Sequence, residues 1–479
     1  MARHLVVCCD GTWNRADQSY KTNVAKVALA VRRRTALGTE QRVYYHSGVG
    51  AQRPERLRGG AFGLGLSRNV LDAYHFLVQT YEPGDRLYLF GFSRGAFTAR
   101  SLAGLVRNCG ILRREQADRT AEAWALYRSR TKQPTSVAAT LFRQAYAHET
   151  EIRFVGVWDT VGSLGIPVPA PWFLRPLVDR FNKRWAFHDT TLSSWVNGAF
   201  QALAVDEQRS AFPPTLWHQQ KGAAEQGQEL RQVWFAGVHT DVGGGEADSS
   251  LSDLPLLWMV RHASRYGLEF DPGVLSRTKP EKPEKPEKPE EPESPTDYLV
   301  RPNALGERHY SRVKFYKVFR VVNRPIGQAV EPPDLKEPGA AGVDVLDGCE
   351  ALSDSVVERY RTPDNPSARD YRPPELDEYL RIYGDARRIE HAPLRVDDPA
   401  PYRVPMTTEA PCPDCDGPLT SGGMLLVHRE DDDTRACRTL WSCAERHHWW
   451  RWADRPGKPL EPCPYPTLFR HVPQGVFQG

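Results

Sequence analysis

One serine in the sequence stands where its hydroxyl could act as a nucleophile. Ser93 is the centre of the segment Gly-Phe-Ser-Arg-Gly at residues 91–95. The apolar run 86–90 predicts a strand before it, and residues 96–106 predict a helix after it. A tight strand-to-helix turn needs small neighbours, which the two glycines supply, and it lifts the hydroxyl above the sheet edge. The helix N-terminus favours negative charge there, so the Arg94 N–H is the predicted first oxyanion donor.

A serine hydroxyl needs a general base, and two polar residues follow predicted strands where the base and its partner could stand. His239 follows the apolar run at 233–238, and Asp159 follows the run at 154–158. The chain order Ser, Asp, His is the usual order of α/β hydrolases. Asp241 is the rival acid, but residues so close on an extended chain diverge in direction. We therefore predict that Asp159 orients His239.

The second oxyanion donor is expected from the loop Asp10-Gly11-Thr12, which follows a predicted buried strand at residues 5–9. The donor would be the backbone N–H of Gly11 or of Thr12. Asp10 would hold the loop by accepting backbone hydrogen bonds. An apolar, proline-broken stretch at residues 167–177 is predicted either to line an acyl-chain trough or to be a buried crossing loop.

The candidate residues Ser93, Asp159 and His239 can meet only if the strands before them end at the same edge of one sheet. Further strands are predicted at 42–46, 152–158 and 233–237, and helices near 24–31, 71–78, 192–205 and 252–265. Strands that alternate with helices indicate a mostly parallel central sheet flanked by helices. The expected fold class is therefore α/β, of the α/β-hydrolase type, with a small zinc-ribbon-like module at the C-terminal end.

Composition divides the chain into four parts. Residues 279–293 read KPEKPEKPEKPEEPE, a solvated repeat in which proline forbids helix and sheet. We predict an α/β-hydrolase core at 1–278, a low-complexity insert at 279–297, the C-terminal part of the hydrolase domain at 298–400 and a cysteine- and tryptophan-rich tail at 401–479. A net charge of +3 over 479 residues gives no reason to expect nucleic-acid binding.

The sequence also bears on where the protein works. No stretch approaches the roughly 18 apolar residues of a membrane helix, and the first residues are too briefly apolar for a signal peptide. We expect a cytoplasmic protein, or one exported without an N-terminal signal peptide.

The tail has the composition of a metal site. The chain has nine cysteines, an odd number with one dense cluster, which disfavours a disulfide framework. Cys412 and Cys415 form a Cys-x-x-Cys knuckle of the kind that binds structural zinc. We predict a zinc ribbon held by Cys412, Cys415, Cys443 and either His447 or His448, with Cys437 as the substitute fourth ligand. Four tryptophans, which argue against disorder, stand at 441, 449, 450 and 452.

Several motifs occur along the chain in the same order as in a known protein family. They are CDGTWN (9–14), TNV (22–24), SGVG (47–50), YEPGDRLYLFGFSRGAFTARSLAG (81–104), VWDTVGSLG (157–165), FHDTTLS (187–193), ALAVDEQRSAFPPTLW (202–217), VWFAGVHTDVGGG (233–245), LSDLPLLWM (251–259) and the weaker SDSVVERY (353–360). The chain resembles a bacterial and fungal family of α/β hydrolases whose best-understood members are phospholipase effectors of type VI secretion, the first lipase-effector class.

The resemblance implies a function and a triad. The family's catalytic serine, aspartate and histidine correspond to Ser93, Asp159 and His239. It implies hydrolysis of acyl esters without a catalytic cofactor, a phospholipid substrate and peripheral contact with a membrane. The KPE insert and the cysteine-rich tail depart from the effectors, so the resemblance supports the chemistry better than a toxin role. The tail is a candidate surface for a protein partner.

Two other readings stay open at this point. Asp10, His239 and Asp241 at strand ends could instead hold the metal of a phosphoesterase. The chain could also be a non-catalytic interaction protein that acts through its zinc-ribbon tail. The complete set of Ser93, Asp159 and His239 favours a serine esterase or phospholipase over both.

Overall fold

The structure is a computed structural model. It describes residues 2–11, 20–47, 62–129, 131, 133–161, 191–210, 212–220, 222–275, 300–311, 321–327, 350–362, 371–383, 389–390, 411–417, 419–428, 435–443, 445, 447–452 and 459–463. The chain divides into two compact units. One comprises Met1–Val260 with Glu269–Val396, and the other comprises Asp397–Gly479 with Arg261–Leu268. The KPE repeat and the proline-broken stretch at 167–177 lie outside the described residues.

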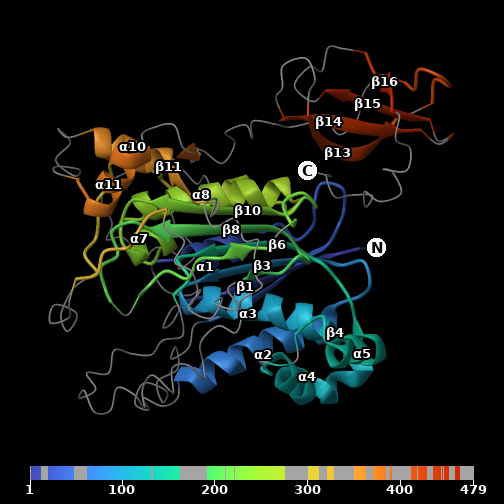
Figure 1. Ribbon diagram of the computed structural model, residues 1–479, viewed down its shortest axis with the longest axis horizontal. Helices are drawn as coiled ribbons and strands as arrows, with labels where there is room; N and C mark the ends of the chain where they lie inside the picture. The colour runs from blue at the N-terminus through green and yellow to red at the C-terminus, as the bar shows by residue number, and fades with distance from the viewer. Residues whose placement is uncertain are drawn as a thin grey trace, which may run out of the picture. The chain divides into compact units, whose positions relative to one another are not determined.

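The first unit is built on one sheet, in which the described strands all run parallel (Figure 1). Its order is β12-β11-β10-β8-β6-β3-β1-β2. The strands are β1 (His4–Cys9), β2 (Gln41–His46), β3 (Arg86–Phe92), β6 (Ile152–Trp158), β8 (Val196–Ala204), β10 (Glu229–Phe235), β11 (Glu350–Ser353) and β12 (Ile389–Glu390). The mostly parallel α/β sheet predicted from the sequence is confirmed.

Helices cover both faces of this sheet because its central strands are apolar on both sides. The described helices are α1 (Asn23–Ala30), α2 (Phe62–Thr80), α3 (Arg94–Cys109), α4 (Thr120–Tyr127), α5 (Val137–Tyr146), α7 (His239–Gly243), α8 (Ser250–Arg265), α9 (Pro272–Leu275), α10 (Asp354–Arg361) and α11 (Pro374–Tyr383), with a 3-10 helix at Arg114–Arg119.

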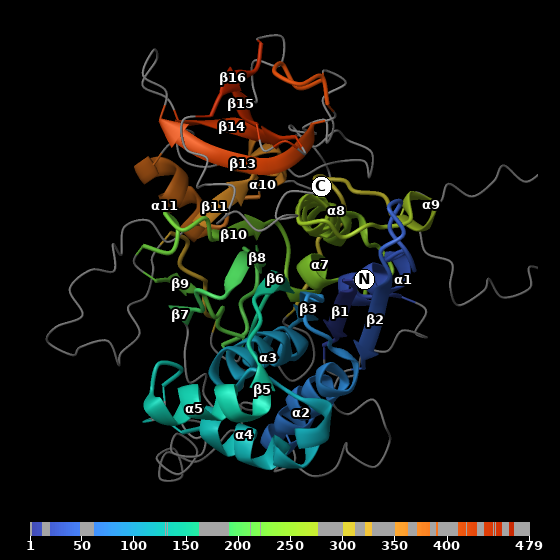
Figure 2. The ribbon, with the colours of Figure 1, turned by 90° about the vertical axis from the view of Figure 1, so that its right-hand side faces the viewer.

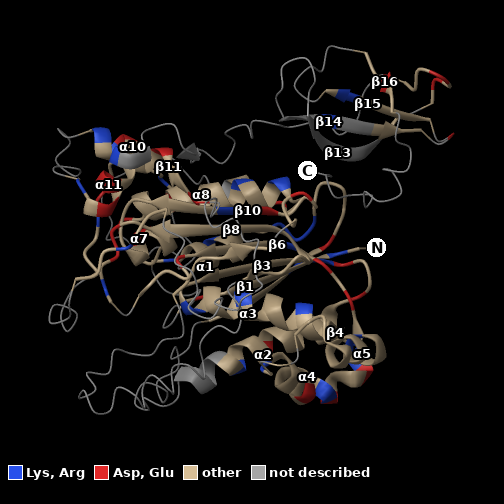
Figure 3. Ribbon diagram, in the orientation of Figure 1, with Lys and Arg blue, Asp and Glu red and all other residues tan. Residues whose placement is uncertain are grey.

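Different helices cover the two faces of the sheet. Figures 1 and 2 show α2 and α3 on one face and α8 on the other. On the α8 face Trp258 packs edge-on against Phe200 and Phe235 of two neighbouring strands. The strands in Figure 3 are mostly free of charged residues, which gather on helices and loops.

Two short β-pairs complete the unit. They are formed by β4 (Ile111–Leu112) with β5 (Ala147–His148) and by β7 (Thr191–Leu192) with β9 (His218–Gln219).

The strand order creates a switch point at the carboxyl ends of β1 and β3. The chain passes from β1 to β2 on one side and then returns to β3 on the other side. Crevices for ligands form at such points in open parallel sheets. In the register, Phe92 pairs with Trp158, so Ser93 and Asp159 leave adjacent strands at the same edge. The order of the strands therefore places both residues where an α/β site opens.

One predicted element has the wrong type. The sequence predicts a helix over residues 192–205, but Val196–Ala204 is the central strand β8. Its residues are buried almost throughout, between β6 and β10. A strand covered on both faces loses the alternation that identifies a strand, and the apolar residues of this one also fall at helical spacing.

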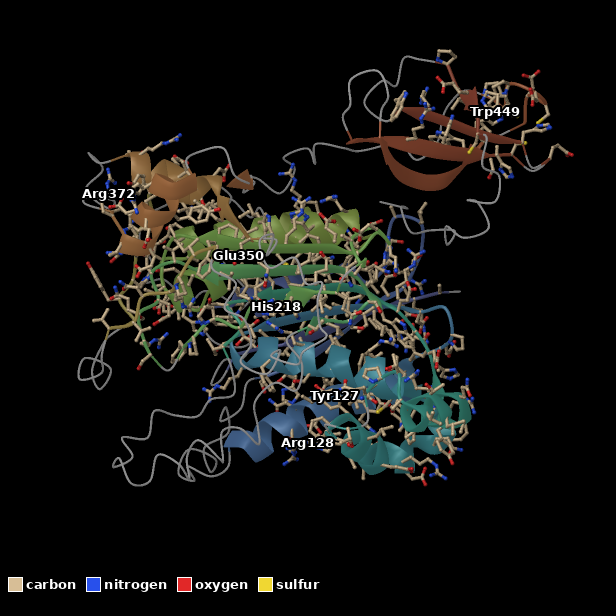
Figure 4. All side chains as sticks on the ribbon, viewed as in Figure 1. Tyr127, Arg128, His218, Glu350, Arg372 and Trp449 are labelled. Atoms are coloured by element: carbon tan, nitrogen blue, oxygen red, sulfur yellow. The ribbon has the colours of Figure 1, made fainter. Side chains whose placement is uncertain are left out.

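The second unit contains an antiparallel sheet of the order β13-β14-β15-β16. Its strands are β13 (Thr420–His428), β14 (Arg435–Ser442), β15 (His448–Trp452) and β16 (Glu461–Pro462). Trp441 and the β15 residue Trp449, labelled in Figure 4, are buried in a small core with Cys412 and Cys443. In the described part of the chain, no helix has the length and apolar character needed to cross a membrane.

Candidate active site

Ser93 occupies the strained turn between β3 and α3. Its backbone has φ 57° and ψ −121°, a region that residues with a side chain rarely adopt. A Cβ added at Gly91 would lie 2.4 Å from the Gly95 carbonyl oxygen. A Cβ added at Gly95 would lie 2.0 Å from the carbonyl oxygen of Cys9 at the end of β1. Both glycines are therefore required by close backbone approach, as the sequence predicts.

Asp159 begins the loop after the adjacent strand β6. The Ser93 N–H donates to the carbonyl oxygen of Trp158 at 3.0 Å, which ties the serine turn to this loop. Asp159 also has a positive φ, 41°, and its side chain is fully buried. The backbone thus holds both residues in conformations that a plain strand end would not need.

His239 stands at the start of α7, after β10. Its Nδ1 lies 2.5 Å from Oδ2 of Asp159. The ring packs on Phe92, the neighbour of Ser93, at a centroid distance of 4.6 Å, and edge-on against Phe212 at 5.0 Å. A Cβ on Gly243 would lie 1.9 Å from the Phe92 ring, so the glycine at this position allows α7 to approach β3. The structure therefore brings the three predicted residues to one edge and pairs the histidine with Asp159.

Asp159 is held by an arginine that the sequence analysis missed. Arg324 donates to both carboxylate oxygens, from Nη1 to Oδ1 at 2.6 Å and from Nη2 to Oδ2 at 3.0 Å. Burial by itself would raise the pKa of Asp159, but Arg324 and His239 outweigh burial and hold it far below its usual range. Asp159 is therefore ionised at neutral pH although it is fully buried.

The surroundings of His239 keep its imidazole neutral. Burial lowers the pKa of His239 below its ordinary 6.5, and the hydrogen bond and charge of Asp159 oppose this only in part. The cation of Arg209 lowers the pKa further, and Glu207 raises it. Glu207 accepts the His239 backbone N–H at 3.3 Å and is paired with Arg209. A neutral imidazole bonded to a carboxylate through Nδ1 can accept a proton at its other nitrogen.

The loop after β1 is fixed by Asp10. Its carboxylate accepts from the Gly11 N–H at 2.6 Å, the Thr22 hydroxyl at 2.6 Å and the Tyr45 hydroxyl at 2.5 Å. The Gly11 N–H would thus have to leave Asp10 to serve an oxyanion. Thr12, the other predicted donor, lies outside the described residues. Arg94 is the first residue of α3, so its backbone N–H lies at the positive end of that helix.

Asp241 has a different partner from His239. It accepts from the Val238 N–H at 2.9 Å, and its Oδ1 lies 2.6 Å from Nδ1 of His309. Asp10 is bound to Thr22 and Tyr45, and His239 to Asp159. Within the described ranges these three residues do not form a group that could hold a metal ion. The ligand set that a metal-dependent phosphoesterase needs is therefore not assembled there.

The tail does bring metal-ligand atoms together. One ligand atom from each of Cys412, Cys415, Cys443 and His447 lies within 4.8 Å of the others, a group that could hold a metal ion. Cys415 Sγ and Cys443 Sγ are 3.7 Å apart, too far for a disulfide. A tetrahedron with zinc–sulfur bonds of about 2.3 Å has edges of about 3.8 Å, which this separation matches. His448 begins β15 and is not in the group, and the Cys437 side chain lies outside those described.

Other residues around the site gave weaker signals in the sequence. Glu207 and Arg209 stand in the motif at 202–217. Because they are charged and the sequence does not give the order of the strands, they would be expected at the surface. His309 and Arg324 lie beyond the KPE repeat, in stretches with no motif or period. Arg324 is 165 positions from Asp159. Contacts at such separation leave no local pattern, so only the fold could find them.

Comparison with known proteins identifies the family. The model of the catalytic domain of Tle1-like phospholipase effectors of the type VI secretion system matches residues 3–262. The chain belongs to this family. All three predicted triad residues lie inside the matched range, whereas Arg324 and His309 lie outside it. The family is described as one of phospholipase effectors, which supports the lipase or esterase function expected from the motifs.

The Tle1-like chain also has individual relatives. It is 30% identical over 234 residues to an uncharacterised protein of Saccharomyces cerevisiae, and this match covers 44% of the chain and 32% of that protein. An uncharacterised protein from Pseudomonas aeruginosa matches with a TM-score of 0.35 and 18% identity, over 56% of this chain and 46% of that one. The Tle1 effector solved bound to the VgrG spike matches with a TM-score of 0.30 and 20% identity, over 51% and 52%.

Proposed function

We propose that the chain is a serine hydrolase that cleaves acyl esters, with phospholipids as its substrate class. The observation that carries the proposal is the contact between His239 Nδ1 and the Asp159 carboxylate beside the strained turn at Ser93. The substrate class rests on membership of the Tle1-like family.

In the proposed mechanism, Ser93 Oγ attacks the acyl carbonyl while His239 takes the hydroxyl proton. Asp159 stays ionised, holds the imidazole with its other nitrogen free, and stabilises the imidazolium that forms. The carbonyl carbon becomes tetrahedral and its oxygen gains negative charge. His239 then gives the proton to the leaving alcohol, and the acyl group stays on Ser93 as an ester. Water attacks this ester while His239 takes a proton from the water, and His239 returns that proton to Ser93 as the free acid leaves.

The negative oxygen would be received at the N-terminus of α3. The Arg94 N–H stands there, and the helix dipole adds to its effect. A second donor from the loop at Gly11 or Thr12 completes the proposed oxyanion hole. Asp10 serves this loop by fixing its course rather than by touching the substrate.

A fluorophosphonate probe tests the nucleophile directly. We expect the probe to label the wild-type chain at Ser93 and to leave Ser93→Ala unlabelled, because the phosphonate forms a bond only to an activated serine. A panel of phospholipids and short-chain esters then gives the substrate class. Wild-type chain that resists the probe and hydrolyses no ester would contradict the proposal. Activity on acetate esters alone would remove the phospholipid assignment and keep the nucleophile.

Two matched substitutions test the acid. Asp159 and Asp241 are both buried, and each is bonded to a histidine. We expect Asp159→Asn to lower kcat by about 10⁴-fold, because the histidine loses the carboxylate that fixes its tautomer. Asp241→Asn should lower kcat far less, since its partner is His309. The reverse order of effects would assign the acid to Asp241.

For the tail we propose one structural zinc ion, held by Cys412, Cys415, Cys443 and His447. Three thiolates and one imidazole, with no position left for water, form a closed zinc site of the structural kind. The metal would hold the loop that carries the knuckle against the strand ends around Trp441 and Trp449. No catalytic step is proposed for it.

A further inference from the structure

Arg324 forms a bidentate contact with Asp159, the residue proposed to orient His239. The Arg324 side chain is only 3% exposed and that of Asp159 is fully buried. Arg324 comes from the described stretch 321–327, which runs beside residues 208–209 through a bridge between Val321 and Arg209. A part of the chain outside the family match therefore contributes the charge next to the proposed acid.

The guanidinium is fixed in place by more than the carboxylate. Nη1 also donates to the Ala204 carbonyl oxygen at 2.9 Å, at the end of β8, and Nη2 donates to the Phe212 carbonyl oxygen at 2.7 Å. Four hydrogen bonds thus hold the guanidinium, two to the carboxylate and two to backbone carbonyls. On the other side, Oδ1 of Asp159 also accepts the Ala204 N–H at 3.1 Å. Backbone groups of Ala204, at the end of β8, and of Phe212 therefore hold the pair in addition to its own contacts.

The arginine changes what Asp159 presents to His239. A lone buried aspartate would stabilise a proton on the imidazole strongly, because nothing screens its charge. With Arg324 at hydrogen-bonding distance the pair has no net charge, so the histidine faces a dipole rather than an anion. Such a histidine is correctly oriented but gives up its proton readily, as a base that must also act as an acid requires.

We propose that Arg324 is a positioning residue: it fixes Asp159 in its ionised form and offsets part of the charge that Asp159 directs at His239. The inference rests on the proposed function, because it assigns His239 as the base. The other titratable groups near His239 are paired: Glu207 with Arg209, and Asp241 of the same helix with His309. The rings of Phe92 and Phe212, which contact His239, carry no charge. Arg324 is the cation that touches the partner of His239 directly.

The test compares Arg324→Gln with Arg359→Gln in the full chain. Arg359 is a matched control, since it is also buried and donates to backbone carbonyls, those of Ala304 and Gly306. Histidine-selective isotope labelling follows the ring of His239 by NMR as pH varies, and the His239→Gln spectrum identifies its signal. The proton uptake of the Asp159–His239 pair should move to higher pH by on the order of one unit in Arg324→Gln and stay in place in Arg359→Gln.

The acidic limb of kcat/KM should move in the same direction as the NMR titration. If the His239 titration is the same in Arg324→Gln as in wild type, the inference is wrong, even where Ser93-dependent hydrolysis stands. If the titration moves as expected but the wild-type chain hydrolyses no ester, the proposed function fails and the electrostatic role of Arg324 stands. The two failures are therefore distinguishable, because the NMR measurement needs no substrate.

A double variant covers the case in which Arg324→Gln does not fold. That substitution leaves Asp159 buried without its cation, whereas Arg324→Gln with Asp159→Asn removes both charges. We expect the double variant to be folded and more stable than Arg324→Gln alone. A double variant that is no more stable than the single one, or that also fails to fold, would show that the arginine serves only to fill space and would overturn the inference.

Discussion

At Ser93 the backbone conformation and the chemistry oppose each other. A φ of 57° suits glycine, yet the residue must carry a hydroxyl to react. Hydrogen bonds hold the turn from both sides, including the Ser93 N–H to Trp158 and the Phe97 N–H to the Ser93 carbonyl. The surrounding fold therefore stabilises a local conformation that the residue itself disfavours, which is a property of functional sites.

This opposition predicts the effect of Ser93→Gly. The variant should lose on the order of 10⁶-fold in kcat, as when a triad serine is removed. Its free energy of unfolding should rise by about 1 kcal/mol, because glycine relieves the strain at positive φ. Ser93→Ala is the matched control, since it keeps the Cβ and should leave stability near wild type. Denaturant unfolding of the three proteins checks this, and a Ser93→Gly protein less stable than Ser93→Ala would contradict it.

The pH dependence of activity belongs to His239. Its pKa lies below the ordinary 6.5, mainly because it is buried, so the imidazole is neutral and able to accept a proton at pH 6.5 and above. We expect kcat/KM to be level across neutral pH and to fall only as pH drops below 6.5. The unfolded chain binds more protons than the folded chain in that same window, so stability falls with activity. A pH–rate profile whose acidic limb lies above 6.5 would contradict the neutral assignment.

The places of the proposed site residues in the fold were predictable where a local pattern marks them. The strand-to-helix turn at Ser93 was predictable because such a turn needs glycines at fixed offsets. The places of Asp159 and His239 after strands were predictable because each residue follows an apolar run. The contact of Arg324 with Asp159 was not predictable, because the sequence does not distinguish a buried, paired arginine from an exposed one. In the tail, spacing predicted Cys412 and Cys415, while the choice of His447 over His448 depended on where β15 begins.

At the scale of elements, glycines set how closely the strands and helices approach. Gly95 lets α3 start against the end of β1, and Gly243 lets α7 lie against Phe92 of β3. The second contact places His239 over the ring next to Ser93. The distance between the proposed base and nucleophile is thus set by the packing of α7 on β3, with no side-chain hydrogen bond required.

A single methyl group should disturb this packing. In Gly243→Ala the added Cβ would lie 1.9 Å from a carbon of Phe92, so α7 must move away. We expect kcat to fall by about 10²-fold, since small misplacements of catalytic groups have effects of that size, and stability to fall by about 1–3 kcal/mol. Gly222→Ala is the control for kcat, since its Cβ would meet open space; its positive φ makes the substitution strained, so stability is not compared with it. Normal kcat in Gly243→Ala would show that α7 does not set the base.

Strands and helices were predictable where their two faces differ in polarity, or where a polar loop marks their end. The strands ending at Cys9 and at Trp158 were recognised from short apolar runs bounded by polar loops. The central strand β8 was predicted as a helix because both of its faces are covered. Trp234 of β10 donates to Glu350, a residue labelled in Figure 4 that starts β11, yet this edge strand is too short to stand out in the sequence.

At the scale of the whole molecule, the hydrolase unit extends beyond the segment that defines its family. The match ends at residue 262, but β11 and β12 extend the sheet, and Arg324 and His309 bond to residues around His239. Along the sequence, the KPE repeat therefore falls between residues of one unit that contact one another. A family member without an equivalent of the 321–327 stretch would need another group to balance Asp159.

The tail provides the last prediction. Its four candidate ligands all lie between residues 412 and 447, whereas the contacts of the proposed triad lie between residues 92 and 324. We expect about one zinc ion per chain by metal analysis, and loss of that zinc in Cys412→Ser/Cys415→Ser because thiolates supply most of the ligands. Amide exchange in β13–β16 should become fast in this variant, while fluorophosphonate labelling of Ser93 continues. Cys463→Ser is the matched control, since Cys463 is also buried but is not part of the group, and it should keep its zinc. Zinc that persists in the double variant would place the metal elsewhere in the chain.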